Sequence, residues 1–446
     1  MTTSELLDKF LYFEKKYNVF NFKTDCGIYW WDIARYSIYT ELNNTFIRKY
    51  VEVEIEAINN KKNLLYIFTT LGKDILYLFK SLFFKKKFFF VLCSRSKNEL
   101  GKNFDIIANP YLKTLHPKEI FCLETFHDAE TEYISYKNTF LSIIKRFKKS
   151  KSYTIDFEIN KLLNEYFGTN INFYEVVQKD LNNYVSEYTY YKQLLKFIKP
   201  NYCFVVQNGI QKGLFAATSD LNIKCIELQH GQINSFHIAY SYANEIDYSH
   251  LNLFPKVLFT YSEFWNKVNY PVIEKINMGL ENKVYKKSDK RYEDIAVVFA
   301  NIYTKNLLSL VKELAPNFKN KIYIKLHPNQ KNEINYIKNE LTEFTNIQII
   351  YIEKTMDEIL SLVSSIIIIQ STSVYEALQK EKKVFVYKKQ DYDTHFDVFS
   401  NKNVYLIENI HDFFINKDKP FVSENQIVFF EPFKKNKFLS YIKENI

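Results

Sequence analysis

The chain has 446 residues, of which 47% are hydrophobic, 17% are aromatic and 25% are charged. These proportions exclude a disordered or fibrous protein, and at roughly 100–200 residues per domain the length predicts two or three domains. The eight glycines are too scattered to form a G-x-x-x-x-G-K-[ST] loop or a G-x-G-x-x-G turn. P-loop NTPases and Rossmann dehydrogenases are therefore excluded.

The net charge of +9 comes from 60 Lys and Arg residues against 51 Asp and Glu residues, and only five of the basic residues are arginines. Nucleic-acid recognition favours the planar guanidinium group of arginine, which can bind a base or phosphate through two hydrogen bonds. Scattered lysines instead give a diffuse positive field that suits anionic substrates or anionic lipid headgroups. We therefore expect no nucleic-acid partner.

The cysteines and the apolar segments bear on the cellular location of the protein. The five cysteines form no C-x-x-C pair, so we interpret them as reduced core residues of a cytoplasmic protein, and the first residues lack the layout of a secretion signal. Lysines interrupt the apolar stretch 64–93 well short of the span of about 18 residues that crosses a bilayer. Two interpretations of this stretch stay open: peripheral contact with an anionic inner membrane at its cytoplasmic face, or an amphipathic helix leading into a buried strand.

Short apolar runs alternate with longer helix-like segments from about residue 88 to residue 385, which is typical of parallel sheets flanked by helices. The pattern predicts an α/β fold with two sheets. In the first half we expect strands at 88–93, 119–124, 202–207, 224–228 and 256–260, and helices over 130–200 and 210–221. In the second half we expect strands at 295–300, 321–326, 347–352, 365–369 and 383–387, and helices at 303–314, 331–343, 356–364 and 373–381.

The regular alternation in the second half predicts one complete doubly wound domain. The polar run ENKVYKKSDK marks the boundary before it. We expect an N-terminal domain over 1–275, a C-terminal domain over 285–420 and a basic C-terminal tail over 421–446.

A serine-rich element follows one of the expected strands, and in doubly wound sheets ligands bind beyond the carboxyl ends of the strands. Ser371, Thr372 and Ser373 open a helix there, where free N–H groups and hydroxyls can bind a phosphate. The same residue types are favoured helix caps, so plain capping is an alternative. Glu376, one turn into this helix, is either an acceptor for ribose hydroxyls or a solvent-facing acid.

A His-Pro pair ends another expected strand, which also carries Lys325. The fixed proline φ at Pro328 holds the imidazole of His327 at the domain edge, where it can donate to a departing phosphate. A second pair, His116-Pro117, precedes a strand instead of following one. We expect that second pair to form an ordinary turn.

A third candidate element, Gln229-His230-Gly231, follows the fourth expected strand. Gly231 permits a sharp exit from the strand, which presents His230 at the sheet edge, where a near-neutral imidazole can act as a base toward a hydroxyl. His237 and Tyr240 lie on the same loop. The alternative is a hydrogen-bonded core histidine.

No metal site is expected from the spacing of the candidate ligands. His230, His237 and His250 fit no zinc pattern. Asp391 and Asp393 resemble the Asp-x-Asp that holds a divalent ion in single-domain sugar transferases, but they lie in a polar loop late in the second sheet. A hydrolase elbow is excluded because no G-x-S-x-G occurs.

The order of these motifs, QHG, then KLHP, then STSVYEAL, resembles bacterial surface-polysaccharide glycosyltransferases of the two-domain GT-B fold. That set contains capsule-synthesis, polysialyl- and teichoic-acid-polymerase-like enzymes. Three further segments, IKCIELQHGQINSFHIAYSY, YWWDIARY and VLCSRSKNELGKNFDIIANPYL, are similar to parts of the same family, so the resemblance covers most of the chain.

The resemblance implies two Rossmann-like doubly wound domains that face a central cleft, with a nucleotide sugar on the C-terminal domain and a glycan or glycolipid acceptor on the N-terminal domain. It implies transfer to a hydroxyl of a growing capsule or lipopolysaccharide glycan without a cofactor or metal, and a CMP-linked sugar acid such as Kdo or a sialic-type acid is the leading donor. The catalytic residues would be His230 and His327. The donor-binding residues would be Lys325, Pro328, Ser371, Thr372, Ser373, Glu376 and Asn301, and the acceptor contacts would be Gln229, His237, Tyr240, Arg95 and Asp105.

Two other classes of protein stay open at this stage. A sugar-nucleotide epimerase of the same two-domain architecture would also need phosphate-binding helices and acid or base residues in the cleft. A non-catalytic scaffold of a polysaccharide assembly complex would bind no nucleotide.

Overall fold

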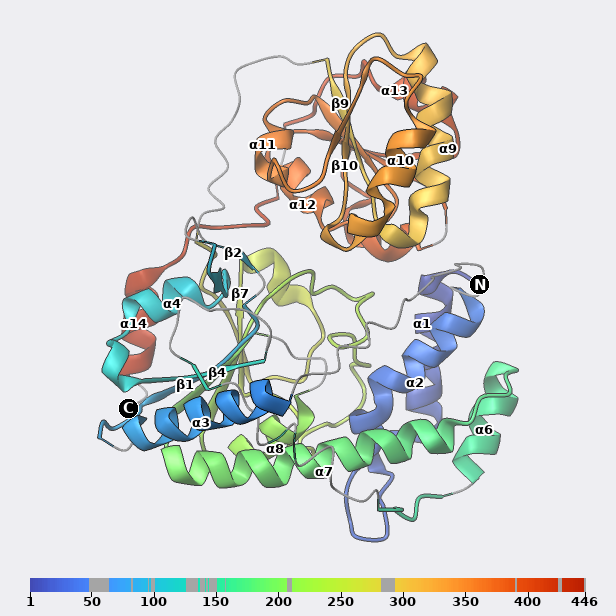
Figure 1. The fold of residues 1–446 in the computed structure, drawn as a ribbon. Helices are drawn as coiled ribbons and strands as arrows, with labels where there is room; N and C mark the ends of the chain where they lie inside the picture. The colour runs from blue at the N-terminus through green and yellow to red at the C-terminus, as the bar shows by residue number, and fades with distance from the viewer. Residues whose placement is uncertain are drawn as a thin grey trace.

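The structure is a computed structural model that describes residues 1–47, 64–81, 83–94, 96–97, 101–125, 135–136, 141, 143, 151–156, 158–206, 211–281, 293–389, 391–423 and 427–444. Within these residues, the strands form two parallel six-stranded sheets and one two-stranded antiparallel pair (Figure 1). The expected α/β fold with two doubly wound domains is therefore confirmed.

The N-terminal sheet has the strand order β4-β1-β5-β6-β7-β8, and all of its neighbouring strands are parallel. The central strands are continuous apolar runs because helices cover both faces of a parallel sheet; the FFFVL of β1, for example, is fully buried. The strands are β1 (Phe88–Leu92), β4 (Ile120–Glu124), β5 (Tyr202–Val205), β6 (Lys224–Leu228), β7 (Val257–Thr260) and β8 (Glu274–Asn277), with the antiparallel pair β2 (Ser96–Lys97) and β3 (Asn103–Phe104).

The helices of the N-terminal domain include two that precede the sheet in sequence, α1 and α2. Figure 1 shows them at one side of the domain, with the N-terminus next to the C-terminal domain. The helices are α1 (Thr3–Tyr17), α2 (Trp31–Phe46), α3 (Leu64–Ser81), α4 (Asn109–Thr114), α6 (Glu158–Phe167), α7 (Phe173–Ile198) and α8 (Lys212–Asp220), with the 3₁₀ turns η1 (Val19–Asn21), η3 (Pro117–Glu119) and η4 (Glu263–Lys267).

The C-terminal sheet has the strand order β11-β10-β9-β12-β13-β14, which is the 3-2-1-4-5-6 order of a Rossmann fold. Its strands are β9 (Ile295–Val298), β10 (Ile322–Lys325), β11 (Ile347–Ile350), β12 (Ser365–Ile368), β13 (Lys383–Tyr387) and β14 (Val404–Ile407). Its helices are α9 (Thr304–Leu314), α10 (Ile334–Glu340), α11 (Met356–Leu360), α12 (Ser373–Gln379) and α13 (Ile410–Asn416), with the 3₁₀ turns η5 (Asn301–Tyr303), η6 (Ala315–Asn317), η7 (Pro328–Glu333) and η8 (Tyr392–Val398).

The C-terminal tail returns to the N-terminal domain. Helix α14 (Lys435–Glu444) buries Phe438 and Ile442 in the same apolar cluster as strands β1, β5 and β7. The chain crosses over at an isolated parallel bridge between Leu280 and Pro432. Gly279 makes this approach possible, because it has a φ of +75° and a Cβ there would lie 2.1 Å from the Pro432 carbonyl oxygen.

The two domains also meet at the N-terminus of α1. The Thr3 hydroxyl donates to Asp391 Oδ1 at 2.7 Å, and the Ser4 N–H donates to Asp393 Oδ2 at 2.8 Å. Asp391 also accepts a hydrogen bond from the hydroxyl of Tyr303. Because the amino end of a helix favours negative charge, these carboxylates fasten α1 to the C-terminal domain.

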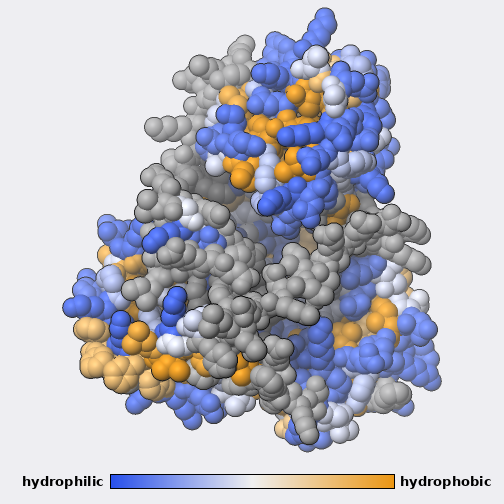
Figure 2. All heavy atoms as spheres, in the orientation of Figure 1, coloured by the Kyte–Doolittle hydropathy of each residue, from blue (hydrophilic) through white to orange (hydrophobic). Residues whose placement is uncertain are grey.

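Three features concern the predictions about reduced cysteines and membrane contact. All five cysteines are free thiols, and three of them, on β4, β5 and β6, are buried. No helix among the described residues is long and apolar enough to cross a membrane. In the orientation of Figure 1, apolar side chains gather on the surface over α3 (Figure 2).

Candidate active site between the two domains

The topology of the C-terminal sheet singles out one place for a ligand. The strand order reverses between β9 and β12, and in open parallel sheets ligands bind at the carboxyl ends of strands beside such a reversal. Asn301 follows β9 and Ser371 follows β12. His327 follows β10, which lies two strand spacings from β12, or about 10 Å. One nucleotide-sized ligand can therefore span the Ser371 and His327 loops.

The serine element, Ser371–Ser373, forms hydrogen bonds among its own groups. The Ser373 N–H donates to Ser371 Oγ at 3.2 Å, and Ser371 Oγ lies 3.1 Å from Ser373 Oγ. Thr372 is exposed, and Glu376 is half-buried one turn further on. These internal hydrogen bonds are those expected of a helix cap, and the Thr372 side chain faces solvent.

His395 holds this element in place, and the sequence analysis did not single it out. Its Nε2 accepts the Ser371 N–H at 2.9 Å, and the side chain is fully buried. Burial lowers the pKa of His395 to about 3, so the ring is neutral and carries its proton on Nδ1. His395 lies in the polar run after β13, where the sequence drew attention only to Asp391 and Asp393 as a possible Asp-x-Asp motif.

His327 is exposed and oriented by its own turn. Its Nδ1 accepts the Asn329 N–H at 3.1 Å, and its backbone N–H donates to Gln330 Oε1 at 2.8 Å. Partial desolvation of the ring and the nearby Lys325 ammonium both lower the pKa of His327. Because Nδ1 is an acceptor in the neutral ring, the proton lies on Nε2, which can donate to an anion.

Tyr351 forms hydrogen bonds with two neighbours of His327, Lys325 and Pro328. The Lys325 ammonium donates to the Tyr351 carbonyl, and burial lowers the pKa of Lys325. The Tyr351 hydroxyl donates to the Pro328 carbonyl at 2.7 Å. Within the described part of the chain, no hydrogen bond joins His327 to Ser371.

The loop after β6 presents His230 at the sheet edge. Gln229 is buried, its amide donates to the Gly231 carbonyl at 2.8 Å, and its oxygen accepts the Tyr261 N–H at 2.9 Å. Both functional groups of Gln229 therefore hold the loop, while His230 is exposed.

His237 and Tyr240 lie deeper on the same loop. Burial, reinforced by the charge of His230, lowers the pKa of His237 to about 4. The hydroxyl of Tyr240 is buried and donates to Glu227, and Tyr270 donates to the other Glu227 oxygen at 3.2 Å. Burial raises the pKa of Glu227 to about 7. Tyr240, expected among the acceptor contacts, thus anchors the loop to β6.

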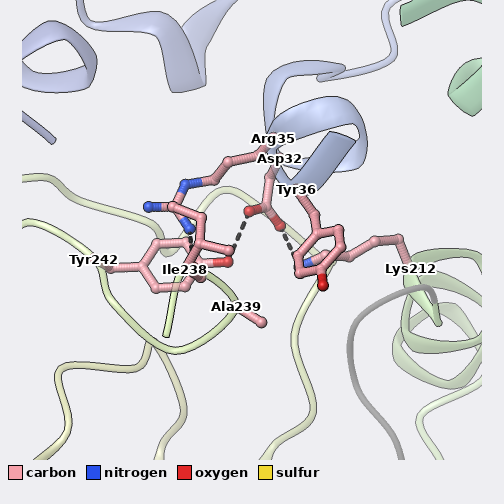
Figure 3. Close-up of a pocket in the computed structure, with 7 residues that line it drawn as sticks. All are labelled: Asp32, Arg35, Tyr36, Lys212, Ile238, Ala239 and Tyr242. Atoms are coloured by element: carbon pink, nitrogen blue, oxygen red, sulfur yellow. Dashed lines mark hydrogen bonds and ion pairs between the residues drawn. The ribbon is translucent and has the colours of Figure 1, made fainter. Parts of the chain in front are cut away.

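The segment YWWDIARY fixes the loop from the other side (Figure 3). The Arg35 guanidinium pairs with buried Glu14 at 2.7 Å and donates to the carbonyls of Ile238 and Ser241. It also stacks on the Tyr242 ring at 4.1 Å. The sequence resemblance did not reveal this role, because it depends on contacts more than 200 positions apart.

A second charged pair lines the small pocket of Figure 3. The Lys212 ammonium lies 2.5 Å from Asp32 Oδ2, and the Tyr242 hydroxyl donates to Asp32 Oδ1 at 2.8 Å. Lys212 begins α8, which follows β5 at the carboxyl edge of the N-terminal sheet. The pocket thus borders the same loop that carries His230 and His237.

Contacts across the domains bring the histidine loop and the serine helix together. Asn234 donates to the Thr394 carbonyl at 3.0 Å and to Asp397 Oδ1 at 3.2 Å. Tyr375, on α12, donates to the same Asp397 and packs edge-on against Trp265 of the N-terminal domain, with ring centroids 4.8 Å apart. Burial raises the pKa of Asp397 to about 6. The histidine loop and the serine helix therefore meet between the two domains.

The remaining expected residues have other positions. Asp105 is buried and accepts the N–H groups of Cys93, Ile107 and Ala108, so it caps the turn into α4, and burial raises its pKa to about 6. Arg95 and the side chain of Asn301 lie outside the described residues.

The carboxylates of the Asp-x-Asp segment are engaged by α1, as described above. Nowhere in the described ranges do three His, Cys, Asp or Glu side chains gather as a metal site would require.

Comparisons with known proteins agree with the resemblance in part. The profile of a family described as "Capsule polysaccharide biosynthesis protein" matches residues 260–395, which include His327 and Ser371–Ser373 and leave out His230. No curated protein sequence matches the chain.

Several solved structures are similar in fold. UDP-GlcNAc 2-epimerase from Methanocaldococcus jannaschii, in complex with UDP-GlcNAc and UDP, is 13% identical, with a TM-score of 0.48 over 80% of this chain and 99% of that chain. MurG from Acinetobacter baumannii is 12% identical, with a TM-score of 0.44 over 80% of this chain and 99% of that chain. Similarities this low carry no argument about activity.

Proposed function

We propose that the protein is a glycosyltransferase that moves a sugar from a nucleotide-activated donor to a hydroxyl of a growing capsule or lipopolysaccharide glycan. The observation that carries the proposal is the meeting of the serine element, at the strand reversal of a Rossmann sheet, with the histidine loop of the other domain. The match to a capsule polysaccharide biosynthesis family over 260–395 supports the same assignment.

On the donor side, this chain offers hydrogen-bond donors to a leaving phosphate. The Nε2–H of His327 and the hydroxyls of Thr372 and Ser373 border the reversal, and Lys325 adds a positive charge nearby. Groups of this kind stabilise the charge that grows on the departing phosphate. We propose a CMP-linked sugar acid such as Kdo or a sialic-type acid as the donor, with Glu376 and Asn301 at its nucleoside.

On the acceptor side, His230 is the proposed base. The acceptor oxygen attacks the anomeric carbon, its proton passes to His230, and the bond from that carbon to the phosphate oxygen breaks, releasing CMP. His237 and Gln229 border the acceptor in this scheme. The charge on the leaving group is balanced by protein donors, so no metal ion is proposed.

A thermal-shift screen with CMP, CDP, UDP and GDP tests nucleotide binding and ranks the donor classes. A nucleotide at a hundred times its Kd stabilises the folded state by about 2.7 kcal/mol, which raises the Tm by roughly 5–10 °C for a domain of this size. A shift with CMP alone supports the proposed donor. The absence of any shift supports the scaffold alternative and refutes the proposal.

The two His-Pro turns supply a matched pair of variants. His116 accepts the Lys118 N–H at 3.3 Å in η3, much as His327 accepts from Asn329, but its turn precedes β4. We expect His327→Ala to lower turnover at least about a hundredfold with the fold intact, and His116→Ala to leave it unchanged. Near-normal turnover of folded His327→Ala would refute the donor assignment.

Product analysis separates transfer from epimerisation. A transferase leaves the nucleotide sugar intact without an acceptor, apart from slow hydrolysis, whereas an epimerase converts it with no acceptor present. Conversion of the nucleotide sugar without an acceptor would replace the proposal by the epimerase alternative.

A further inference from the structure

Helix α3 has two apolar faces, and the protein covers only one of them. Tyr77 and Leu78 face the N-terminal sheet, where the Tyr77 hydroxyl accepts the Cys122 N–H at 3.1 Å and its ring lies 5.0 Å from that of Phe121. Asp74 and Ser81 share this buried face. Sheet packing therefore accounts for the residues at 74, 77, 78 and 81, one stripe of the helix.

The opposite stripe is apolar and faces solvent. Ile75, Leu76 and Phe79 are 51%, 53% and 58% exposed, and Phe83, just past the helix, is 69% exposed. Residues 75, 76 and 79 lie on one face of the helix, and the Phe83 ring packs against that of Phe79 with centroids 5.6 Å apart. Figure 2 shows the corresponding apolar surface at the lower left of the molecule, over α3. Contiguous exposed apolar surface of this kind marks a binding face.

An apolar groove lies beside this stripe. It has a volume of about 540 Å³ and opens between the end of α3, helix α4 and the edge strand β4. Phe84, Leu112, Pro117 and Ile120 contribute its apolar lining. The groove extends the exposed stripe into the domain.

Lysines surround the groove. Lys80, Lys86, Lys113 and Lys118 line its rim, and none of them forms a salt bridge with a described residue. The Lys118 ammonium lies over the Phe84 ring at 5.2 Å. The nearby acid Glu119 is already paired with Lys87 at 2.6 Å. The rim therefore carries a net positive charge around an apolar floor.

We propose that this face, formed by α3, residues 83–86 and the groove, binds the surface of an anionic lipid bilayer. Apolar side chains on an interfacial helix enter the acyl region of a membrane, and lysines beside them bind anionic headgroups. Lipid phosphates would lie on the lysine rim, and acyl methylenes would fill the groove. The face goes beyond the proposed transfer reaction, since it lies on the side of the N-terminal domain away from the C-terminal domain (Figure 1).

Sedimentation with vesicles tests the proposal. The full chain is mixed with vesicles of phosphatidylcholine alone, or of equal parts phosphatidylcholine and phosphatidylglycerol. We expect binding to the anionic vesicles that weakens as salt is added, because salt screens the lysines. Since each lysine near an anionic surface contributes roughly fivefold in binding, Lys80→Gln with Lys118→Gln should lower the partition coefficient roughly 25-fold.

A second pair of variants isolates the apolar contribution. Leu76→Ser with Phe79→Ser should lower binding at least about tenfold at any salt concentration. Matched controls on the C-terminal domain are Ile352→Ser with Ile415→Ser, both exposed apolar residues, and Lys319→Gln with Lys338→Gln. These controls should bind as the unmodified protein does.

Three results would overturn the proposal: no binding of the unmodified protein to anionic vesicles, equal losses in the control variants, or a dimer in solution that Leu76→Ser with Phe79→Ser dissociates. The last result would assign the face to a second copy of the chain. Turnover on a soluble acceptor should not change in any of these variants, so failure of the membrane proposal is distinguishable from failure of the proposed transfer.

Discussion

Replacing His395 by glutamine tests whether a neutral, buried imidazole holds the serine element. A glutamine at this position can accept the Ser371 N–H through its side-chain oxygen, as the imidazole Nε2 does at 2.9 Å, but it does not titrate. His395→Gln should therefore keep nucleotide binding near that of the unmodified protein. His395→Leu, which removes the acceptor, should weaken it, because the Ser371 N–H loses its partner at a cost of about 1–3 kcal/mol.

The contribution of His395 to the free energy of unfolding depends on pH. Burial lowers the pKa of His395 from 6.5 to about 3, so below pH 6.5 the unfolded chain binds a proton that the folded chain does not. Stability therefore falls as the pH falls from 6.5 toward 3. Between pH 7 and pH 5 this single group removes about 2 kcal/mol of the free energy of unfolding, and the full loss is about 5 kcal/mol.

Urea unfolding followed by tryptophan fluorescence at pH 7 and pH 5 measures this difference. The unmodified protein should lose about 2 kcal/mol more than His395→Gln between the two pH values. His411→Gln, a change at an exposed histidine on α13, is the control and should behave as the unmodified protein. Equal losses in the unmodified protein and in His395→Gln would refute the assignment of a buried neutral ring.

Three further predictions concern the domain contacts and the chemistry. Gly279→Ala should destabilise the protein by at least about 3 kcal/mol, because the new Cβ would overlap Pro432. Gly168→Ala is the control: Gly168 has a similar φ of +71° but lies in open space, so the change should cost about 1 kcal/mol. Thermal unfolding of the two variants measures the difference. Thr3→Val should cost about 1.5–3 kcal/mol by removing a buried hydrogen bond to a carboxylate, and Thr40→Val, with an exposed hydroxyl, less than about 0.5 kcal/mol. Turnover should be unchanged by EDTA, and a loss that magnesium restores would contradict the metal-free scheme.

The sequence predicted the sheets well because their strands are continuous apolar runs. All ten expected strands are present, and the expected turn at His116-Pro117 is η3, directly before β4. Four described strands were not predicted: the edge strands β8 and β14 and the two-residue strands β2 and β3. The EKIN of β8 contains a single apolar residue, so it lacks the apolar run that identifies a buried strand. The VYLI of β14 is an apolar run of only four residues that is partly buried, and it was missed.

The helices at the start of the chain show that long-range contacts could not be predicted from the sequence. The hydrogen bonds of Arg35 to the Ile238 and Ser241 carbonyls, and that of the Thr3 hydroxyl to Asp391, join segments that are far apart in sequence. A local pattern gives no indication of such partners, because charged residues on a helix are ordinarily solvated.

For the candidate site, the sequence could predict loops but not the orientation of individual side chains. The rule that ligands bind at carboxyl ends of parallel strands led to His327, Ser371 and His230, and the last two lie on loops that meet between the domains. The rule does not say which side chain on a loop faces the ligand. The side chains of Gln229 and Tyr240 form hydrogen bonds within the protein. His395, which belongs to none of the predicted motifs, positions Ser371.

The placement of the lysine-rimmed face has a consequence for the acceptor. Lys86 precedes β1 and Lys118 precedes β4, so the groove lies at the amino ends of these strands, whereas the histidine loop lies at the carboxyl end of β6 in the same parallel sheet. A bilayer bound at the groove and an acceptor bound near His230 are then separated by the length of the sheet, about 17 Å for a five-residue strand. Under the two proposals together, a lipid-linked acceptor would have to extend past this distance before its end reached His230. We therefore predict that a glycan that already carries several sugars is a better acceptor than the bare membrane anchor.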